Sequence, residues 1–150
     1  MGPLKIWFAS SEVEPFVKTG GLADVAGSLP RALRQSGVDD RVVLPKYGQI
    51  PREYVERMAF LGSVEVDLTW RRQYCGVFRL VMNGIHCYFL DNEYYFKRDA
   101  LYGQGDDGER FAFFSRAILE VLPMIGFQPD ILHLNDWQTA MVPVIDDAHY

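Results

Sequence analysis

An apolar segment that leads through a glycine pair into a helical pattern restricts the fold more than any other part of the sequence. Residues 4–10 are mostly apolar or aromatic, which is typical of a short buried strand. Apolar residues recur at helical spacing from Leu22 to Leu33, and residues 40–45 form a second strand-like run. Strand, helix and strand within about 40 residues predict a right-handed parallel βαβ unit.

Pro30 stands inside this predicted helix. Proline removes a hydrogen-bond donor and crowds the preceding helical turn, so we expect a bend or break near Gly27 and Ser28. Gly37 is the expected end of the helix, because glycine readily takes the left-handed conformation that closes many helices.

A β-hairpin is predicted in the middle of the chain. Two strand-like runs, residues 77–82 and 85–90, flank Asn83-Gly84, the dipeptide that favours a two-residue turn. A helix follows the hairpin, and after the helix comes a short buried strand over residues 130–134. We therefore expect one α/β domain, with a Rossmann-like parallel sheet as its core and the hairpin inserted into it.

Composition excludes several classes of function. The 150 residues are 49% hydrophobic, which is enough for one domain with a core, and the formal net charge of −5 is spread along the chain. An acidic chain without basic blocks is not expected to bind nucleic acid or an anionic membrane. No apolar run reaches the roughly 18 residues of a membrane span, and no leader pattern begins the chain, so a bacterial cytoplasm is expected.

Neither a disulfide nor a metal site is predicted. Hairpin pairing would place Cys75 and Cys87 on opposite faces of the sheet, so we expect two buried, reduced thiols. His86 is interpreted as a packed or surface histidine, because no ligand residue stands at metal-binding spacing beside it. No cofactor is expected.

The loop between the first strand and the first helix is a candidate anion site. Gly20 and Gly21 allow a ligand to approach the backbone closely, and the beginning helix presents unpaired N–H groups there. Lys18 would add a positive charge, and Asp24 follows in the first helical turn. The alternative is an ordinary turn with a solvated lysine, because the spacing matches neither the dinucleotide-binding motif nor the P-loop.

A second strand-to-helix junction contains Asn135, Asp136 and Gln138. The carboxyl ends of parallel strands share one edge of the sheet, so we expect Lys18 and Asp136 to line one cleft. Tyr47, after the second strand, is a candidate ligand wall at that edge, and simple packing of an aromatic residue at a strand end is the alternative. Helix capping alone is the alternative role for Asp136.

Aromatic and turn residues are concentrated between Asp91 and Gly105. Exposed aromatic rings with scattered polar groups suit stacking on a sugar chain, and Tyr95 is the candidate substrate-binding residue among them. The alternative interpretation is a loop whose aromatic side chains anchor it to the core.

The sequence resembles the bacterial glycogen synthases and plant starch synthases from Lys5 to about Pro143. The matching motifs are Ser11-Glu12 through Pro15, Lys18-Thr19-Gly20-Gly21-Leu22-Ala23-Asp24-Val25, Leu29-Pro30, Tyr95-Phe96, Leu101-Tyr102-Gly103, Glu109-Arg110-Phe111 and Asn135-Asp136-Trp137. Gln138 departs from the family pattern, which generally has histidine there, and glutamine cannot carry the imidazole charge.

The resemblance implies a retaining glycosyltransferase that moves glucose from ADP-glucose to the non-reducing end of an α-1,4-glucan. It implies a GT-B fold, in which residues 1–150 are a truncated N-terminal, acceptor-side domain and the C-terminal nucleotide-binding domain is absent. In this family the lysine at the position of Lys18 contacts the nucleotide sugar. The catalytic-site histidine would lie beyond Tyr150, so no catalytic residue is assigned and this chain alone is expected to be inactive. A stand-alone glucan-binding or regulatory module is the alternative function.

Overall fold

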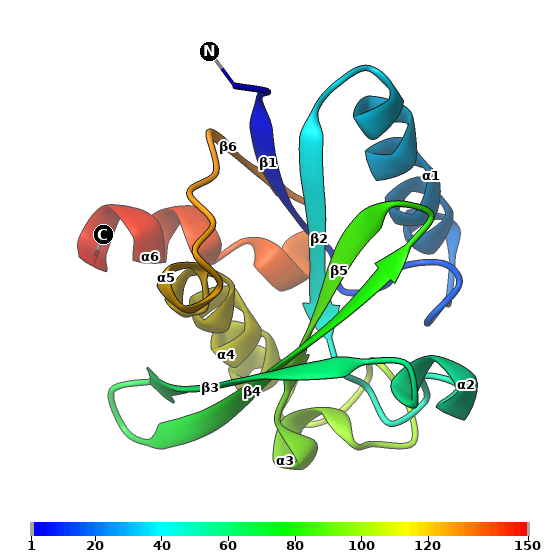
Figure 1. The fold of residues 1–150 in the computed structure, drawn as a ribbon. Helices are drawn as coiled ribbons and strands as arrows, with labels where there is room; N and C mark the ends of the chain where they lie inside the picture. Colours follow the sequence, from blue (N-terminus) through cyan, green and yellow to red (C-terminus); the bar gives the residue numbers. More distant parts are fainter. Residues whose placement is uncertain (1, 150) are drawn as a thin grey trace.

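The computed structural model describes residues 2–149 and contains one six-stranded sheet in the order β3-β4-β5-β2-β1-β6 (Figure 1). The strands are β1 (Lys5–Ala9), β2 (Asp39–Pro45), β3 (Ala59–Asp67), β4 (Arg72–Met82), β5 (Ile85–Asp91) and β6 (Ile131–Leu134). The helices are α1 (Gly21–Gln35), α2 (Arg52–Val55), α3 (Glu93–Phe96), α4 (Asp107–Glu120), α5 (Leu122–Ile125), the 3-10 helix η1 (Trp137–Thr139) and α6 (Val142–His149).

The parallel core confirms the predicted βαβ unit. Strand β1 lies between β2 and β6 and pairs with both in parallel, and β2 also pairs in parallel with β5. The indole N–H of Trp7 donates to the carbonyl of Ile118 at 2.9 Å, which attaches α4 to one face of the sheet. Val42, on the opposite face, lies near Ala26 of α1. The sheet is therefore covered by α1 on one side and α4 on the other.

The hairpin confirms its predicted register. Met82 pairs with Ile85 and Leu80 pairs with Cys87, across a turn in which Asn83 has φ 53° and Gly84 has φ 78°. Both positive angles suit a two-residue hairpin turn. Strand β5 pairs with β4 on one side and with β2 on the other, so it joins the antiparallel strands to the parallel core.

The sequence predicts a bend or break near Gly27 and Ser28, and the structure contradicts the break. Helix α1 is continuous although Pro30 lies inside it, and Pro30 is buried. Gly27 packs closely against the preceding loop, because a Cβ atom at Gly27 would lie 2.7 Å from the carbonyl oxygen of Glu14. We attribute the continuity of the helix to this close packing, which offsets the hydrogen bond that proline cannot make.

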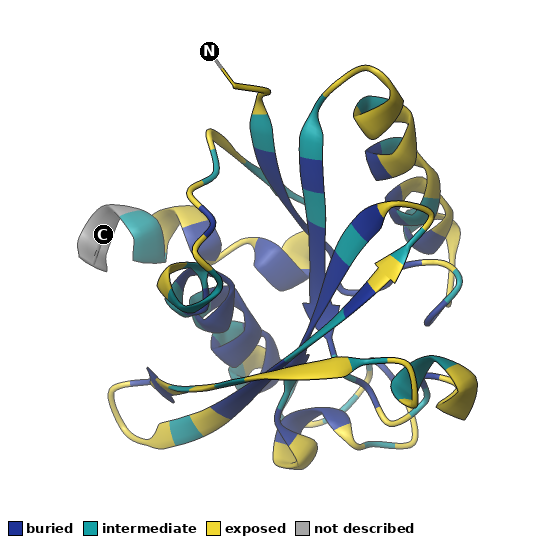
Figure 2. Ribbon diagram, viewed as in Figure 1, coloured by how far each residue is buried: buried dark blue, intermediate teal, exposed yellow. Residues whose placement is uncertain are grey.

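Figure 2 shows the buried residues concentrated in the central strands and α4. Cys75 and Cys87 are both free and buried, as predicted, and burial raises the pKa of each thiol to about 12. His86 is half-buried. Within residues 2–149, no group of three His, Cys, Asp or Glu side chains is placed to hold a metal ion, and no helix is sufficiently long and apolar to cross a membrane.

Candidate substrate-binding edge

The two strand-to-helix junctions lie at the same edge of the sheet. Ala9 pairs with Leu134 in the parallel β1–β6 register, so the loops that follow these strands begin side by side. Asn135 connects them directly, because its side-chain amide donates to the carbonyl of Ala9 at 2.8 Å. Both junctions therefore open on one edge of the sheet, as the sequence predicts.

Glu12 is the centre of the loop after β1, a role that sequence reasoning missed. Glu12 is 3% exposed, and its carboxylate accepts hydrogen bonds from the backbone N–H groups of Thr19 and Gly20, each at 3.1 Å. The hydroxyls of Thr19 and Tyr102 also donate to it, at 2.5 and 2.7 Å. Burial alone would raise the pKa of Glu12, but the hydrogen bonds outweigh burial and hold this pKa below its ordinary value.

This carboxylate already occupies part of the predicted anion site. Gly20 is the residue before α1, and its N–H points to Glu12 instead of to open solvent or a ligand. The N–H groups of Gly21 and Leu22 begin the helix and have no carbonyl four residues earlier inside it. The part of the helix end that suits a ligand anion is therefore Gly21 and Leu22.

Lys18 and Asp24 form an ion pair across the same loop. The amine of Lys18 lies 2.8 Å from Oδ1 of Asp24, and the side chains are 49% and 55% exposed. The hydrogen bond with Asp24 and the charge of Asp24 raise the pKa of Lys18. An exposed pair of this kind contributes little to stability, so an incoming anion can replace the carboxylate at little cost.

Tyr102 links the loop to the second junction. Its hydroxyl lies 2.6 Å from that of Ser11, and its ring centre lies 6.2 Å from that of Trp137. Trp137 is 51% exposed and follows Asp136, whose carboxylate accepts the Trp137 N–H at 2.8 Å. Asp136 therefore caps η1, while its exposed position at the edge also leaves it accessible to a ligand.

Three candidate side chains point away from solvent. Tyr95 is fully buried, with its ring centre 4.9 Å from that of Phe113, and its neighbour Tyr94 is the 57% exposed ring. Gln138 is 3% exposed, and its side-chain oxygen has no hydrogen-bond partner within the described residues. Tyr47 is 2% exposed. The expectations of an exposed ring at Tyr95 and of a ligand wall at Tyr47 are therefore wrong, because packing against the core determines both positions.

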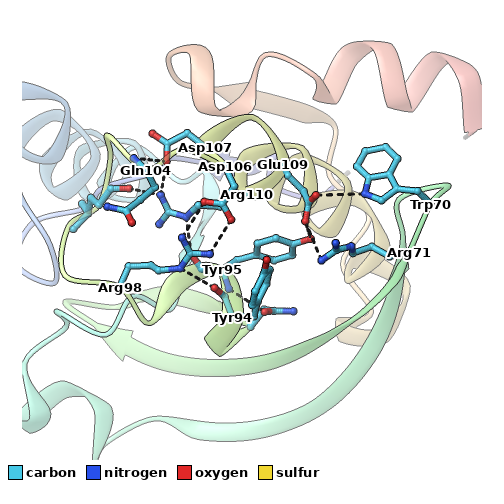
Figure 3. Close-up of polar contacts among 12 residues, drawn as sticks. Trp70, Arg71, Tyr94, Tyr95, Arg98, Gln104, Asp106, Asp107, Glu109 and Arg110 are labelled. Atoms are coloured by element: carbon cyan, nitrogen blue, oxygen red, sulfur yellow. Dashed lines mark hydrogen bonds and ion pairs between the residues drawn. The ribbon is translucent and has the colours of Figure 1, made fainter.

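A buried arginine anchors the segment that carries these aromatic residues (Figure 3). Arg110 is 0% exposed, and its guanidinium donates to the carbonyls of Tyr95 and Leu101 at 2.6 and 2.9 Å. It also pairs with Asp107 at 2.8 Å. Charge-assisted bonds from one guanidinium thus fix two stretches of backbone against α4.

Two surface pairs complete this network in Figure 3. Arg98 makes two hydrogen bonds of 2.9 Å to the carboxylate of Asp106. Glu109 accepts the hydroxyl of Tyr95 and pairs with Arg71 at 3.4 Å. The motif Glu109-Arg110-Phe111 therefore has a structural role, which is to hold the rim of the edge in place.

Comparison with known proteins identifies the family. Residues 5–150 match the family model for the starch synthase catalytic domain. The chain belongs to this family. A glycogen synthase from Anoxybacillus flavithermus is 56% identical over 147 residues, and one from Geobacillus stearothermophilus is 58% identical over 147 residues. Each alignment covers 98% of this chain and 30% of the relative.

Part of a solved starch synthase has the same fold as this chain. The catalytic domain of starch synthase IV from Arabidopsis thaliana, bound to ADP and acarbose, matches with a TM-score of 0.88 and 34% sequence identity. The match covers 99% of this chain and 31% of that one. The chain thus spans about a third of the length of the starch and glycogen synthases it matches. The predicted family and the α/β fold are confirmed, and the assignment of individual residues to substrate binding stays a prediction.

Proposed function

We propose that this chain is the N-terminal, acceptor-side part of a glycogen synthase that has the two-domain GT-B fold. The complete enzyme transfers glucose from ADP-glucose to the non-reducing end of an α-1,4-glucan, with retention at the anomeric carbon. The observation that carries the proposal is the family match over residues 5–150. The cytoplasm of a bacterium is the proposed location, and neither a metal nor a cofactor is part of the proposed reaction.

The groups at the exposed edge support this proposal. Lys18 would exchange Asp24 for the diphosphate and stabilise its charge as the bond to glucose breaks. Gly20 and Gly21 would allow close approach of the backbone, next to the free N–H groups of the helix. Asp136 would bind sugar hydroxyls from the neighbouring junction, since carboxylates accept such hydrogen bonds readily.

Three further candidate residues would hold this edge in place instead of contacting the substrate. Asn135 holds β6 to β1 through the carbonyl of Ala9. Gln138 and Tyr95 lie in the interior, so they would act on the substrate only by positioning their neighbours. In the starch synthase IV structure the bound molecules are ADP and acarbose, and we extend these two ligand classes to this chain as ADP-glucose and glucan.

Lys18→Ala tests the donor role. We expect ADP-glucose to shift the backbone amide resonances of residues 18–24 in the ¹⁵N-labelled chain, and Lys18→Ala to weaken this binding about tenfold by removing a charge-assisted contact. Lys97→Ala is the matched control, because Lys97 forms a similar exposed pair with Glu93 at 3.2 Å. An equal effect of both substitutions would contradict a specific role for Lys18.

Catalytic turnover distinguishes the proposed enzyme from the alternative, a stand-alone glucan-binding or regulatory module. We expect the complete protein, with its second domain, to transfer glucose from ADP-glucose to a maltooligosaccharide, and the 150-residue chain to transfer none. Glucan binding without transfer by the complete protein would favour the stand-alone module.

A further inference from the structure

A cavity lies at the edge of the sheet opposite the candidate substrate-binding edge, where β1 and β2 begin. Its volume is about 420 Å³, and its charged lining residues are Arg34, Asp39, Arg41 and His86. In Figure 1 this is the region where α1 ends and β2 begins, away from the loops that follow β1 and β6. The proposed glucosyl transfer therefore does not use this cavity.

The sheet register brings basic side chains together here. Val42 pairs with Cys87 in parallel, so the preceding residues, Arg41 and His86, lie on adjacent strands. Arg34 reaches this region from the last turn of α1, and its Nε atom would lie 3.1 Å from a Cβ atom built on Gly84 in the hairpin turn. Burial lowers the pKa of His86, and the nearby positive charges of Arg41, Arg79 and Arg34 lower it further.

Positive charge exceeds negative charge in this cavity. Among the described residues that line it, Asp39 is the only carboxylate, and it accepts hydrogen bonds from Arg41 at 3.2 and 3.3 Å. The remaining terminal nitrogen of Arg41 donates to the hydroxyl of Tyr88 at 3.3 Å. No ion pair joins Arg34 to a carboxylate within residues 2–149. The charge of Arg34 is therefore uncompensated by direct contact.

The position of Arg34 at a helix end offers a simpler explanation, since basic residues favour helix C-termini. The carbonyls of Leu33 and Arg34 already accept the N–H groups of Val38 and Gly37, at 3.2 and 2.9 Å. Helix capping thus leaves the guanidinium of Arg34 free to bind something else. The Nδ1 atom of His86 is buried without a hydrogen-bond partner among the described residues, although His86 itself lines the cavity.

We propose that this cavity binds a small phosphate-bearing anion, held by the guanidinium groups of Arg34 and Arg41 and by the imidazole of His86. Guanidinium groups match the geometry of phosphate oxygens and remain charged at every physiological pH. The volume suits a small phosphorylated metabolite, because small-molecule sites typically occupy about 300–1,000 Å³. The site would make this edge of the chain a second ligand-binding surface, independent of glucosyl transfer.

Inorganic phosphate is the probe that tests the site. The chain contains three histidines, so ¹³C-labelled imidazole resonances give three resolvable reporters, with His86 assigned from His86→Gln. We expect phosphate, titrated against sodium chloride at constant ionic strength, to shift the His86 resonance saturably and to leave His133 unshifted. Equal shifts with phosphate and chloride would overturn the proposal.

Arg34→Gln provides the decisive variant, because Arg34 is exposed and its replacement is not expected to unfold the chain. We expect about tenfold weaker phosphate binding from the loss of one charge-assisted contact. Arg52→Gln is the matched control, since Arg52 is 90% exposed and pairs only with Glu56 among the described acidic residues. Lys18→Ala, at the other edge, should leave the His86 titration unchanged. Equal weakening by Arg34→Gln and Arg52→Gln would show only diffuse electrostatic attraction and would overturn the site.

Discussion

Glu12 illustrates how one buried carboxylate organises the loop before α1. It accepts hydrogen bonds from the loop before α1 and from Tyr102, which lies ninety positions further along the chain. In the sequence, Glu12 is only one residue of a motif. No local pattern predicts which hydrogen-bond donors its carboxylate will contact. The carboxylate of Glu12 therefore lies at the place where sequence patterns predict an anion that belongs to a ligand.

Replacing Glu12 with glutamine should loosen this loop. Glutamine keeps the shape but removes the charge that strengthens hydrogen bonds to Thr19 and Gly20, so we expect a loss of about 1 to 3 kcal/mol in the free energy of unfolding. The folded-state pKa of Glu12 is lowered, so its contribution is present above its unfolded pKa and disappears as pH falls through the folded pKa. Urea unfolding at neutral and acidic pH measures both effects. Glu56→Gln, at an exposed site, should change stability little, and an equal loss there would contradict this role.

Asp40 should show the opposite dependence on pH. Both of its carboxylate oxygens are buried without hydrogen-bond partners among the described residues, and burial, with the charge of Asp39, raises its pKa from 3.8 to about 7. The contribution of protonated Asp40 to the stability of the folded chain is therefore complete below pH 3.8, and it is lost as pH rises to about 7. We expect Asp40→Asn to stabilise the chain increasingly over this range, measured as the difference in unfolding free energy from the native sequence. A difference that does not change with pH would refute this assignment.

At the scale of single elements, local patterns predict the strands and the hairpin, and tertiary packing decides the rest. The Asn83-Gly84 turn fixes the register of β4 and β5 from sequence alone, because both residues accept positive φ angles. Helix α1 continues through Pro30, against its local preference, since the preceding loop packs against Gly27. The break predicted from proline chemistry is thus prevented by a contact that no local pattern contains.

Gly27→Ala tests this close packing. Alanine favours a helix, but its Cβ atom would lie 2.7 Å from the backbone oxygen of Glu14, so we expect a net destabilisation of about 1 to 3 kcal/mol. Gly108→Ala in α4 is the matched control, because a Cβ atom there meets nothing within 4 Å and should leave stability unchanged or slightly increased. Thermal unfolding of both variants measures the difference. Stabilisation by Gly27→Ala would show that the loop moves aside easily.

At the scale of the whole molecule, the sequence predicts the parallel βαβ unit and the position of the candidate edge, because the carboxyl ends of parallel strands share one edge of the sheet. The exposure of individual side chains does not follow in this way. Tyr94 and Tyr95 are adjacent and chemically identical, yet one is 57% exposed and the other 0%. Arg110 and Phe113 bury Tyr95 by long-range contacts, and the same kind of contact buries Gln138 beside Ser115. Burial at this edge is a property of the assembled fold.

The pairing of β1 with β6 joins Ala9 to Leu134, residues from nearly opposite ends of the sequence. By contrast, β4 and β5 meet through a two-residue turn, and local pairs of this kind form early in folding because little chain entropy is lost. We expect the candidate edge to be assembled late, only after most of the chain is in place. A molecule that binds there would recognise the finished fold and shift the folding equilibrium of the entire domain towards the native state.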